Sequence, residues 1–448
     1  MGEAPDGNGV VGPLRRLLGP VTVGEFTRLS GGASKETWSF DAIGPDGTRT
    51  GLILRRDSAG RPAEPDALQR EAAAITIAHN AGLPVPELLF SFPAGVAGLD
   101  TAGMIMRRVD GETIARRILR DDEYASARLA LVRQVAEFAA RLHRGTLPAG
   151  FPRPDPLAVL REQLDAFGRP SEVFELAMTE LAATRPPARE PVLLHGDFRL
   201  GNVIVGPEGL RAVLDWELTH AGDPAEDLGW LCVKAWRFGA AAPVAGLGSR
   251  EQLLATYRAA GGADISLSEL RWWEILGTLR WGVICLTQAW AHLSGAHRSV
   301  ELAAIGRRVC EQEWDLLLLL DPEAANRAAR ARPRLTGAPQ RQHAPFGRPT
   351  ATELLEAVRE YLLGDVMSAT SGQVAFHARV AANALATVAR ELELSHAPPA
   401  GGVPAGGELA GGEPTGGELA GGELAGADLA NRVAASLAIA NPKYFGDV

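Results

Sequence analysis

Three polar residues in one stretch of the chain have the types and the spacing that phosphoryl transfer requires. The segment His195-Gly-Asp-Phe-Arg-Leu-Gly-Asn contains Asp197 and Asn202, and Asp215 follows in Leu214-Asp-Trp-Glu. Phosphoryl transfer needs a carboxylate that orients the attacking hydroxyl, oxygen ligands that hold Mg²⁺ on the phosphates, and nearby positive charge. We therefore expect Asp197 to be the catalytic base, and Asn202 and Asp215 to be metal ligands.

Other polar side chains surround this set. Arg199 lies two residues after Asp197 and is well placed to neutralise a γ-phosphate. We expect His195 to form structural hydrogen bonds, and Asp223 and Asp227 to brace loops or to cap the helix near Pro224. Glu217 fits either a second metal or a surface position, and the sequence leaves both open.

Short strands position these residues. Short strands are predicted at Val192–Leu194, Val203–Val205 and Leu210–Leu214, where they interrupt a helical pattern. A hairpin between the last two would bring Asp197, Asn202 and Asp215 to one edge. Upstream, three more strands are predicted near residues 26–30, 36–40 and 51–55, a helix over about 66–80, and a strand pair ending in Gly103-Met-Ile-Met-Arg.

Taken in order, these motifs resemble the aminoglycoside phosphotransferase and choline kinase family, which is related to protein kinases. His195-Gly-Asp stands where protein kinases have His-Arg-Asp, and Asp215-Trp-Glu stands where they have Asp-Phe-Gly. The resemblance covers about residues 21–321 and is strongest to the phosphotransferase domains that precede acyl-CoA dehydrogenase domains. It implies a two-lobed kinase-like fold, ATP and Mg²⁺ as cofactors, and a small-molecule hydroxyl as the acceptor.

The same resemblance assigns nucleotide contacts. Arg55 replaces the lysine that contacts the α- and β-phosphates, with Glu71 as its helix partner. Arginine can fork onto phosphate oxygens but is larger than lysine. The alternative is a solvent-facing arginine on an edge strand. Ser34 is expected to cover the phosphates, and Met106 to contact the adenine from the hinge between the lobes.

The predicted architecture is α+β with a helical C-terminal domain. We expect an antiparallel-sheet lobe over residues 20–108, a mainly helical lobe over 109–325, a linker over 326–348 and a helical domain over 349–448. Repeats of Gly-Gly-Glu-Leu-Ala mark a low-complexity loop at 398–425, since such a composition cannot bury a core. Few contacts are expected to cross the chain near Arg330.

Composition excludes several classes of protein. The net charge of −9 over 448 residues argues against a general nucleic-acid binder. Uncharged apolar runs are too short to span a membrane, no secretory signal is visible, and the three cysteines are far apart, as in a cytoplasmic protein.

Some alternatives stay open at this level. Arg55 also fits a catalytically weak nucleotide-binding module, and an inverted nucleotide would transfer AMP instead of phosphate. The acceptor is not readable, because tryptophans and glutamates are mixed in the second lobe. The oligomeric state is not indicated either.

Overall fold

The computed structural model describes residues 8–29, 35–57, 66–168, 171–297, 299–331, 351–395 and 422–445. These residues form two units by their internal contacts. The first joins Met1–Pro156 with Thr184–Gly277, and the second joins Leu157–Ala183 with Thr278–Val448. Ser34, a predicted phosphate contact, lies outside the described residues.

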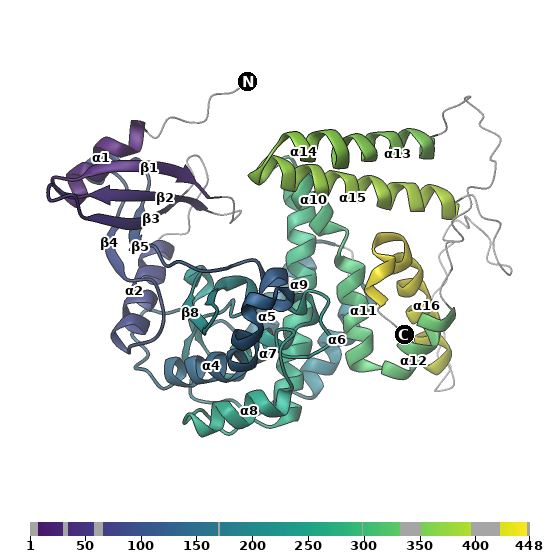
Figure 1. Cartoon of the computed structure of the whole chain (residues 1–448). Helices are drawn as coiled ribbons and strands as arrows, with labels where there is room; N and C mark the ends of the chain where they lie inside the picture. The colour runs from purple at the N-terminus through teal and green to yellow at the C-terminus, as the bar shows by residue number, and fades with distance from the viewer. Residues whose placement is uncertain are drawn as a thin grey trace. The chain divides into compact units, whose positions relative to one another are not determined.

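An antiparallel sheet forms the N-terminal part of the first unit (Figure 1). Its strands follow the order β1-β2-β3-β5-β4. Their bounds are β1 Thr22–Arg28, β2 Lys35–Ile43, β3 Arg49–Asp57, β4 Leu88–Phe92 and β5 Gly103–Arg107. The predicted strands are therefore all present, and β3 lies between two neighbours instead of at an edge.

One face of this sheet is apolar and packs on a helix that was not predicted. Helix α1, Asn8–Leu18, begins before the expected lobe boundary at residue 20. Its Val10 and Leu14 join Trp38 and Phe40 of β2 in the buried core of the sheet. The alternation along β2 produces this core, since every second side chain faces the same side.

The other face of the sheet carries the polar residues of interest. Arg55 of β3 pairs with Thr37 of β2 and with Met104 of β5 in the strand register. Helix α2, Ala67–Asn80, supplies Glu71. The helix ends at Asn80, and Gly82 two residues later has a positive φ of 68°, which suits glycine.

Helices and two small two-stranded sheets make up the rest of the first unit. Strands β6 (Val192–Leu194) and β9 (His220–Gly222) pair antiparallel, as do β7 (Val203–Gly206) and β8 (Gly209–Val213). The helices are α3 Ala115–Arg120, α4 Ala125–His143, α7 Ala225–Cys232, α8 Arg250–Ala259 and the first part of α9, Leu267–Leu293. Asp197 lies in the loop that follows β6, and Asp215 lies in the loop that follows β8.

The second unit is helical (Figure 1). Its helices are α5 Pro156–Ala166, α6 Glu172–Ala183, the end of α9, α10 Val300–Gly306, α11 Val309–Leu320, α12 Pro322–Ala331, α13 Ala351–Tyr361, α14 Met367–Ala369, α15 Gly372–Ser395 and α16 Gly422–Ala440. Helix α12 covers the first residues of the predicted linker, and α16 covers the end of the predicted low-complexity loop. The rest of both segments lies outside the described residues.

Buried contacts tie the C-terminal helix to α11, which contradicts the expectation of few contacts across Arg330. The ring of Phe445 packs edge-on against Trp314, with centroids 5.0 Å apart. The Tyr444 hydroxyl donates to Asp315 at 2.7 Å, and Asn441 Nδ2 donates to Glu311 at 3.0 Å. Alanines on α12 and α16 allow close helix packing, so the helices on both sides of residue 330 share one core.

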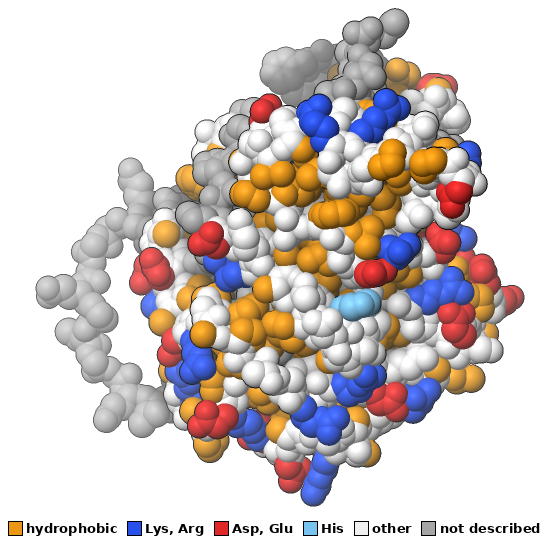
Figure 2. All heavy atoms as spheres, turned by 90° about the vertical axis from the view of Figure 1, so that its left-hand side faces the viewer, with side chains coloured by type: hydrophobic (Ala, Val, Ile, Leu, Met, Phe, Trp, Pro, Cys, Tyr) orange, Lys and Arg blue, Asp and Glu red, His pale blue; other side chains and the backbone are white. Residues whose placement is uncertain are grey.

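Charge on the visible surface is mixed. Figure 2 shows one face of the molecule, on which basic and acidic side chains are interspersed with apolar ones. Among the described residues, no helix is both long enough and apolar enough to cross a membrane.

Candidate functional site

The loop after β6 is held by a buried carboxylate. Asp227 of α7 accepts hydrogen bonds from the backbone amides of His195 and Gly196, each at 2.9 Å. Gly196 has a φ of 81°, and an added Cβ would lie 2.1 Å from the carbonyl oxygen of Leu218. Glycine is therefore required at position 196, because any side chain would clash with the Leu218 carbonyl.

Asp227 stays ionised because several donors face it. Burial by itself raises the pKa of Asp227, but hydrogen bonds from His143 and from the loop amides outweigh it and lower the pKa to about 2. His143 in turn contacts the Tyr257 hydroxyl at 2.9 Å through its other ring nitrogen. The predicted bracing role of Asp227 is thus confirmed, and Asp223 likewise accepts from the Ala225 amide at 2.8 Å as a helix cap.

Both ring nitrogens of His195 form hydrogen bonds with backbone atoms. Nδ1 accepts from the Asp197 amide at 3.1 Å, so Nε2 carries the proton and donates to the Leu214 carbonyl at 2.9 Å. This ring therefore joins the loop of Asp197 to the residue before Asp215. The structural role expected for His195 is confirmed.

The Asp197 carboxylate is surrounded by donors. Asn202 Nδ2 donates to Oδ2 at 2.6 Å, and Arg199 Nε lies 3.1 Å from Oδ1. Trp230 Nε1 donates to Oδ1 at 2.7 Å. Donors of this kind fix the plane of the carboxylate, which suits a group that must accept a hydrogen bond from a hydroxyl.

Two tryptophans at this site were missed by reasoning from the sequence. Trp230 lies on α7 three residues after Asp227, and it therefore lies close to the same loop. The Arg199 guanidinium lies over the Trp236 ring, 4.7 Å from its centroid. The only signal was the helical spacing from Asp227, because the tertiary approach of the indole to Asp197 leaves no local pattern.

Asp215 begins the loop after β8 in an unusual backbone conformation. Its φ and ψ are 67° and 61°, in the left-handed region that non-glycine residues rarely adopt. The Leu214 amide donates to the Asn202 carbonyl at 2.8 Å, so the two loops are joined directly before it. The predicted hairpin therefore brings Asn202 and Asp215 together.

Arg55 reaches the same loop from the sheet. Its Nη2 contacts Asp215 at 2.5 Å and Glu217 at 3.1 Å, and its Nε lies 3.2 Å from Glu71. The predicted pairing with Glu71 is present, and the solvent-facing alternative is wrong. The contact with Glu217 was not predicted, and it makes Arg55 the centre of three carboxylates.

Burial and charge act against each other in this cluster. Burial raises the pKa of Glu71 to about 7, although Arg55 and Lys35 lower it. Burial by itself lowers the pKa of Arg55, but Glu71, Asp215 and Glu217 outweigh it and raise the pKa above its usual range. Lys35 opens β2 and pairs with Asp57 at 2.9 Å.

The apolar side of the site lies on the sheet. Met106 of β5 is buried and faces Ile53 of β3 in the strand register. Strand β5 ends at Arg107, and the chain continues from Arg108 to α3. The role of Met106 as an adenine contact at a hinge between the lobes stays a prediction.

The oxygen atoms near Asp215 fit a magnesium ion. Asn202 uses its Nδ2 on Asp197, which leaves the amide Oδ1 as a ligand, and Asp215 and Glu217 add carboxylate oxygens. Within the described ranges, no group of three or more His, Cys, Asp and Glu side chains forms a metal cage. Mg²⁺ usually takes only one or two carboxylates and completes its shell with phosphate and water, so this donor set suits it.

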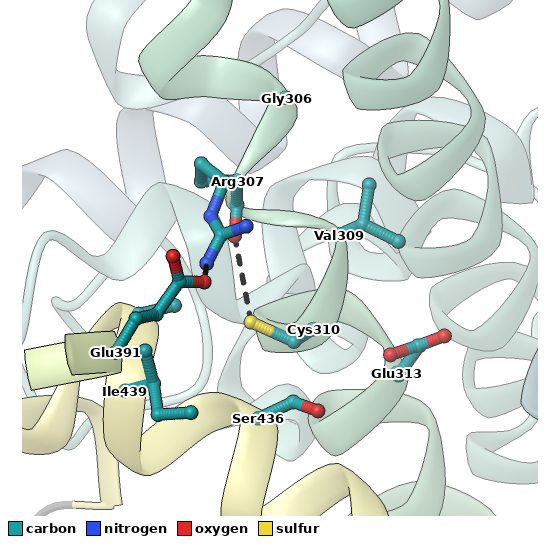
Figure 3. A pocket seen from close by; sticks show the side chains of 9 residues that line it. Gly306, Arg307, Val309, Cys310, Glu313, Glu391, Ser436 and Ile439 are labelled. Atoms are coloured by element: carbon teal, nitrogen blue, oxygen red, sulfur yellow. Dashed lines mark hydrogen bonds and ion pairs between the residues drawn. The ribbon is translucent and has the colours of Figure 1, made fainter. Parts of the chain in front are cut away.

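A cavity in the second unit lacks the chemistry of the site around Asp197. It has a volume of about 310 Å³ and is lined by Arg307, Cys310 and Glu391 among others (Figure 3). Arg307 pairs with Glu391, and the Cys310 thiol donates to the Arg307 carbonyl. Burial raises the pKa of Cys310 to about 12, so this thiol is not a nucleophile.

Comparisons with protein families match two parts of the chain. The model of the phosphotransferase enzyme family matches residues 25–273, which is more than half of the sequence. A second model, for a domain of unknown function (DUF6285), matches residues 368–444. The two matched ranges contain the site around Asp197 and the helices α15 and α16, respectively.

The relatives found by sequence are much longer proteins. Acyl-CoA dehydrogenase family member 11 of Gallus gallus is 32% identical over 198 residues, covering 40% of this chain and 24% of the relative. Acyl-CoA dehydrogenase family member 10 of Mus musculus is 28% identical over 249 residues, covering 49% of this chain and 21% of the relative. The chain therefore spans about a quarter or less of the length of these relatives.

A solved structure shares the fold. A protein of Ralstonia eutropha JMP134, assigned as an aminoglycoside phosphotransferase, superposes with a TM-score of 0.52 at 17% identity. The match covers 68% of this chain and 97% of the other. At this identity the likeness concerns the fold alone, and it agrees with the α+β architecture predicted from the sequence.

Proposed function

Because this chain belongs to the phosphotransferase enzyme family, we propose that it moves the γ-phosphate of ATP to a hydroxyl group of a small molecule. Its fold is the two-lobed, protein-kinase-like α+β fold, followed by a helical C-terminal domain. The observation that carries the proposal is the oriented, partly exposed carboxylate of Asp197 beside Asn202 and Asp215.

Each residue of the site has a defined task in this proposal. Asp197 accepts a hydrogen bond from the acceptor hydroxyl and takes its proton as the new phosphorus–oxygen bond forms, while the bond to the β-phosphate oxygen breaks and ADP leaves. Arg199 offers the guanidinium that offsets charge on the transferred phosphate. Arg55, fixed by Glu71, binds the α- and β-phosphates, and Met106 lies against the adenine.

Asn202 and Asp215 would hold the magnesium ion through their side-chain oxygens. Mg²⁺ bound there would neutralise charge on the phosphates and orient them. The residues of the chain keep these oxygens in place without the ion, because Asn202 is fixed by Asp197 and the Asp215 loop is joined to β7. Ser34 remains a proposed phosphate contact on sequence grounds.

The contact of Arg55 with Asp215 also supports the second candidate, a catalytically weak nucleotide-binding module. An arginine that stays on the metal-binding carboxylate would keep the metal away.

The cysteines, all buried free thiols, agree with a reducing cytoplasm.

A screen for phosphorylated products tests the proposal and separates the candidates. The purified chain is incubated with ATP, Mg²⁺ and hydroxylated metabolites, hydroxyacyl-CoA thioesters or aminoglycosides, and products are identified by mass spectrometry. A mass gain of one phosphate, with ADP as co-product and loss of the reaction in Asp197→Asn, supports the proposal. Transfer of AMP with release of pyrophosphate, or nucleotide binding without any product, would contradict it.

A further inference from the structure

One cation is shared by three carboxylates at the candidate site. A single nitrogen of Arg55, Nη2, contacts both Asp215 and Glu217, while Nε faces Glu71. Three carboxylates around one guanidinium leave excess negative charge at this point, so the cluster attracts further cations. Lys35, the neighbouring cation on β2, is already paired with Asp57.

The oxygens that hold Arg55 are those that fit a divalent metal. Asp215 Oδ1 already accepts a charged hydrogen bond from the guanidinium of Arg55, at 2.5 Å. A metal ion on Asp215 and Glu217 would lie against the same nitrogen, and two cations at such a distance repel each other strongly. Arg55 and the metal therefore compete for these two carboxylates.

The guanidinium has a geometry that allows exchange of partners. It carries five N–H donors in a rigid plane, so Nε can remain on Glu71 while Nη2 leaves Asp215. Glu71 is buried on α2 and fixes that end of the side chain. Phosphate oxygens are the acceptors that a released guanidinium binds best.

We propose that Arg55 is an internal counter-cation that occupies Asp215 and Glu217, so that a divalent metal binds tightly only together with a nucleotide. The nucleotide phosphates take the guanidinium as the metal takes the carboxylates. This inference rests on the proposed function for the identity of the nucleotide. It also makes Glu217 a positioning residue for Arg55.

Titration with Mn²⁺ in the absence of nucleotide tests the competition directly. Free Mn²⁺ is measured by electron paramagnetic resonance for the full chain and for Arg55→Ala. Removal of the competing cation should tighten Mn²⁺ binding by about tenfold, a coupling within the usual range between two sites. The gain should disappear in Arg55→Ala/Asp215→Asn, since the carboxylate is then lost. Metal-free ATP should bind Arg55→Ala more weakly than the wild type.

Two further variants serve as controls for this titration. Arg56→Ala is the matched control, because Arg56 lies beside Arg55 on β3 but pairs with Glu36 at 2.8 Å. Its Mn²⁺ affinity should equal that of the wild type. Arg55→Lys retains a cation for Glu71 if Arg55→Ala does not fold. A lysine cannot span Glu71 and Asp215 at once, so Mn²⁺ should again bind more tightly.

The outcomes decide the inference without any assay of turnover. Equal Mn²⁺ affinity in the wild type, Arg55→Ala and Arg55→Lys would overturn it, as would a gain that survives Asp215→Asn. If no phosphorylated product is ever found, the metal titration still gives its answer. Failure of the proposed function and failure of this inference are therefore separable.

Discussion

Two clusters of carboxylates lie in different units of the molecule and differ in how far they are exposed. In the first unit, the side chains of Asp197, Asp215 and Glu217 retain 15%, 26% and 29% of their accessible surface. In the second unit, Glu311 retains 5% and Asp315 only 2%. Both clusters are paired with cations or hydroxyl donors, so pairing alone does not distinguish a site from a structural network.

The partners of the two clusters explain the difference. Asp215 and Glu217 are held by Arg55, which has other binding modes available, and Asp215 adopts a strained backbone conformation. Glu311 and Asp315 are held by Asn441 and Tyr444, which lie in the same helical core. Accessible carboxylates with replaceable partners indicate chemistry, whereas buried carboxylates with fixed partners join helices.

The largest expected effect concerns the base. Asp197→Asn keeps the volume of the side chain but removes its negative charge, so turnover should fall by ~10²–10⁴-fold. ATP affinity should change little, since Asp197 does not contact Arg55. Steady-state rates with the acceptor found by the screen measure this. Asp315→Asn is the matched control from the second cluster and should lower stability without lowering turnover per folded molecule.

Either variant can contradict this contrast between the two carboxylate clusters. If Asp197→Asn turns over like the wild type, Asp197 is not the base and its hydrogen-bonded setting is structural. If Asp315→Asn abolishes turnover while the chain remains folded, the second cluster is part of the active machinery.

The second cluster should dominate stability. Phe445→Ala removes a buried ring that packs against Trp314, and such losses cost ~3–5 kcal/mol. Urea denaturation followed by tryptophan fluorescence measures the free energy of unfolding. Phe376→Ala is the matched control, because this ring on α15 is largely exposed. A similar small loss for both variants would show that the C-terminal contact contributes little.

A truncation sharpens the same point. Ending the chain at Ala331 removes α16 and exposes the apolar sides of α11 and α12, so this product should aggregate. Size-exclusion chromatography of the truncated chain gives the result. A monodisperse product that still binds ATP would restore the expectation that the kinase-like part ends before residue 330.

A buried carboxylate of the first unit should make stability depend on pH. The pKa of Glu71 is raised from 4.5 to about 7, so the folded state holds this proton more tightly than the unfolded chain. Its contribution to stability therefore falls as the pH rises from about 4.5 to about 7 and is constant above, with a total on the order of 3 kcal/mol.

Glu71→Gln should flatten this part of the stability curve. Thermal melts between pH 5 and pH 8 compare the slopes of the two proteins. Glu36→Gln removes a carboxylate from another arginine pair of the same sheet and serves as the control. Identical slopes for wild type and Glu71→Gln would mean that Glu71 stays ionised throughout, with Arg55 outweighing burial.

The smallest predicted effect concerns Trp230. Trp230→Phe removes the indole donor from Asp197, and a hydrogen bond to a charged group contributes ~1.5–3 kcal/mol. We expect a reduced kcat, because the Asp197 carboxylate then loses one of the donors that orient it. A kcat equal to that of the wild type would make Trp230 a packing residue only.

The sequence determined the local features of this protein. Glycines, alternating apolar residues and the spacing of Asp197, Asn202 and Asp215 depend on neighbours along the chain, and these predicted the strands and the two loops. The likeness in motif order predicted the family, and the pairing of Arg55 with Glu71 followed from it. Helix α1 was missed because its glycines and proline weaken the helical pattern.

Tertiary structure alone decided which distant groups meet. Trp230 reaches Asp197, Glu217 reaches Arg55, and Tyr444 reaches Asp315 across 129 positions of the chain. Long side chains and helix packing create these contacts, and neither leaves a periodic signal in the sequence. For the same reason the helices beyond residue 331 could not be assigned from the sequence to the core that they share with α11 and α12.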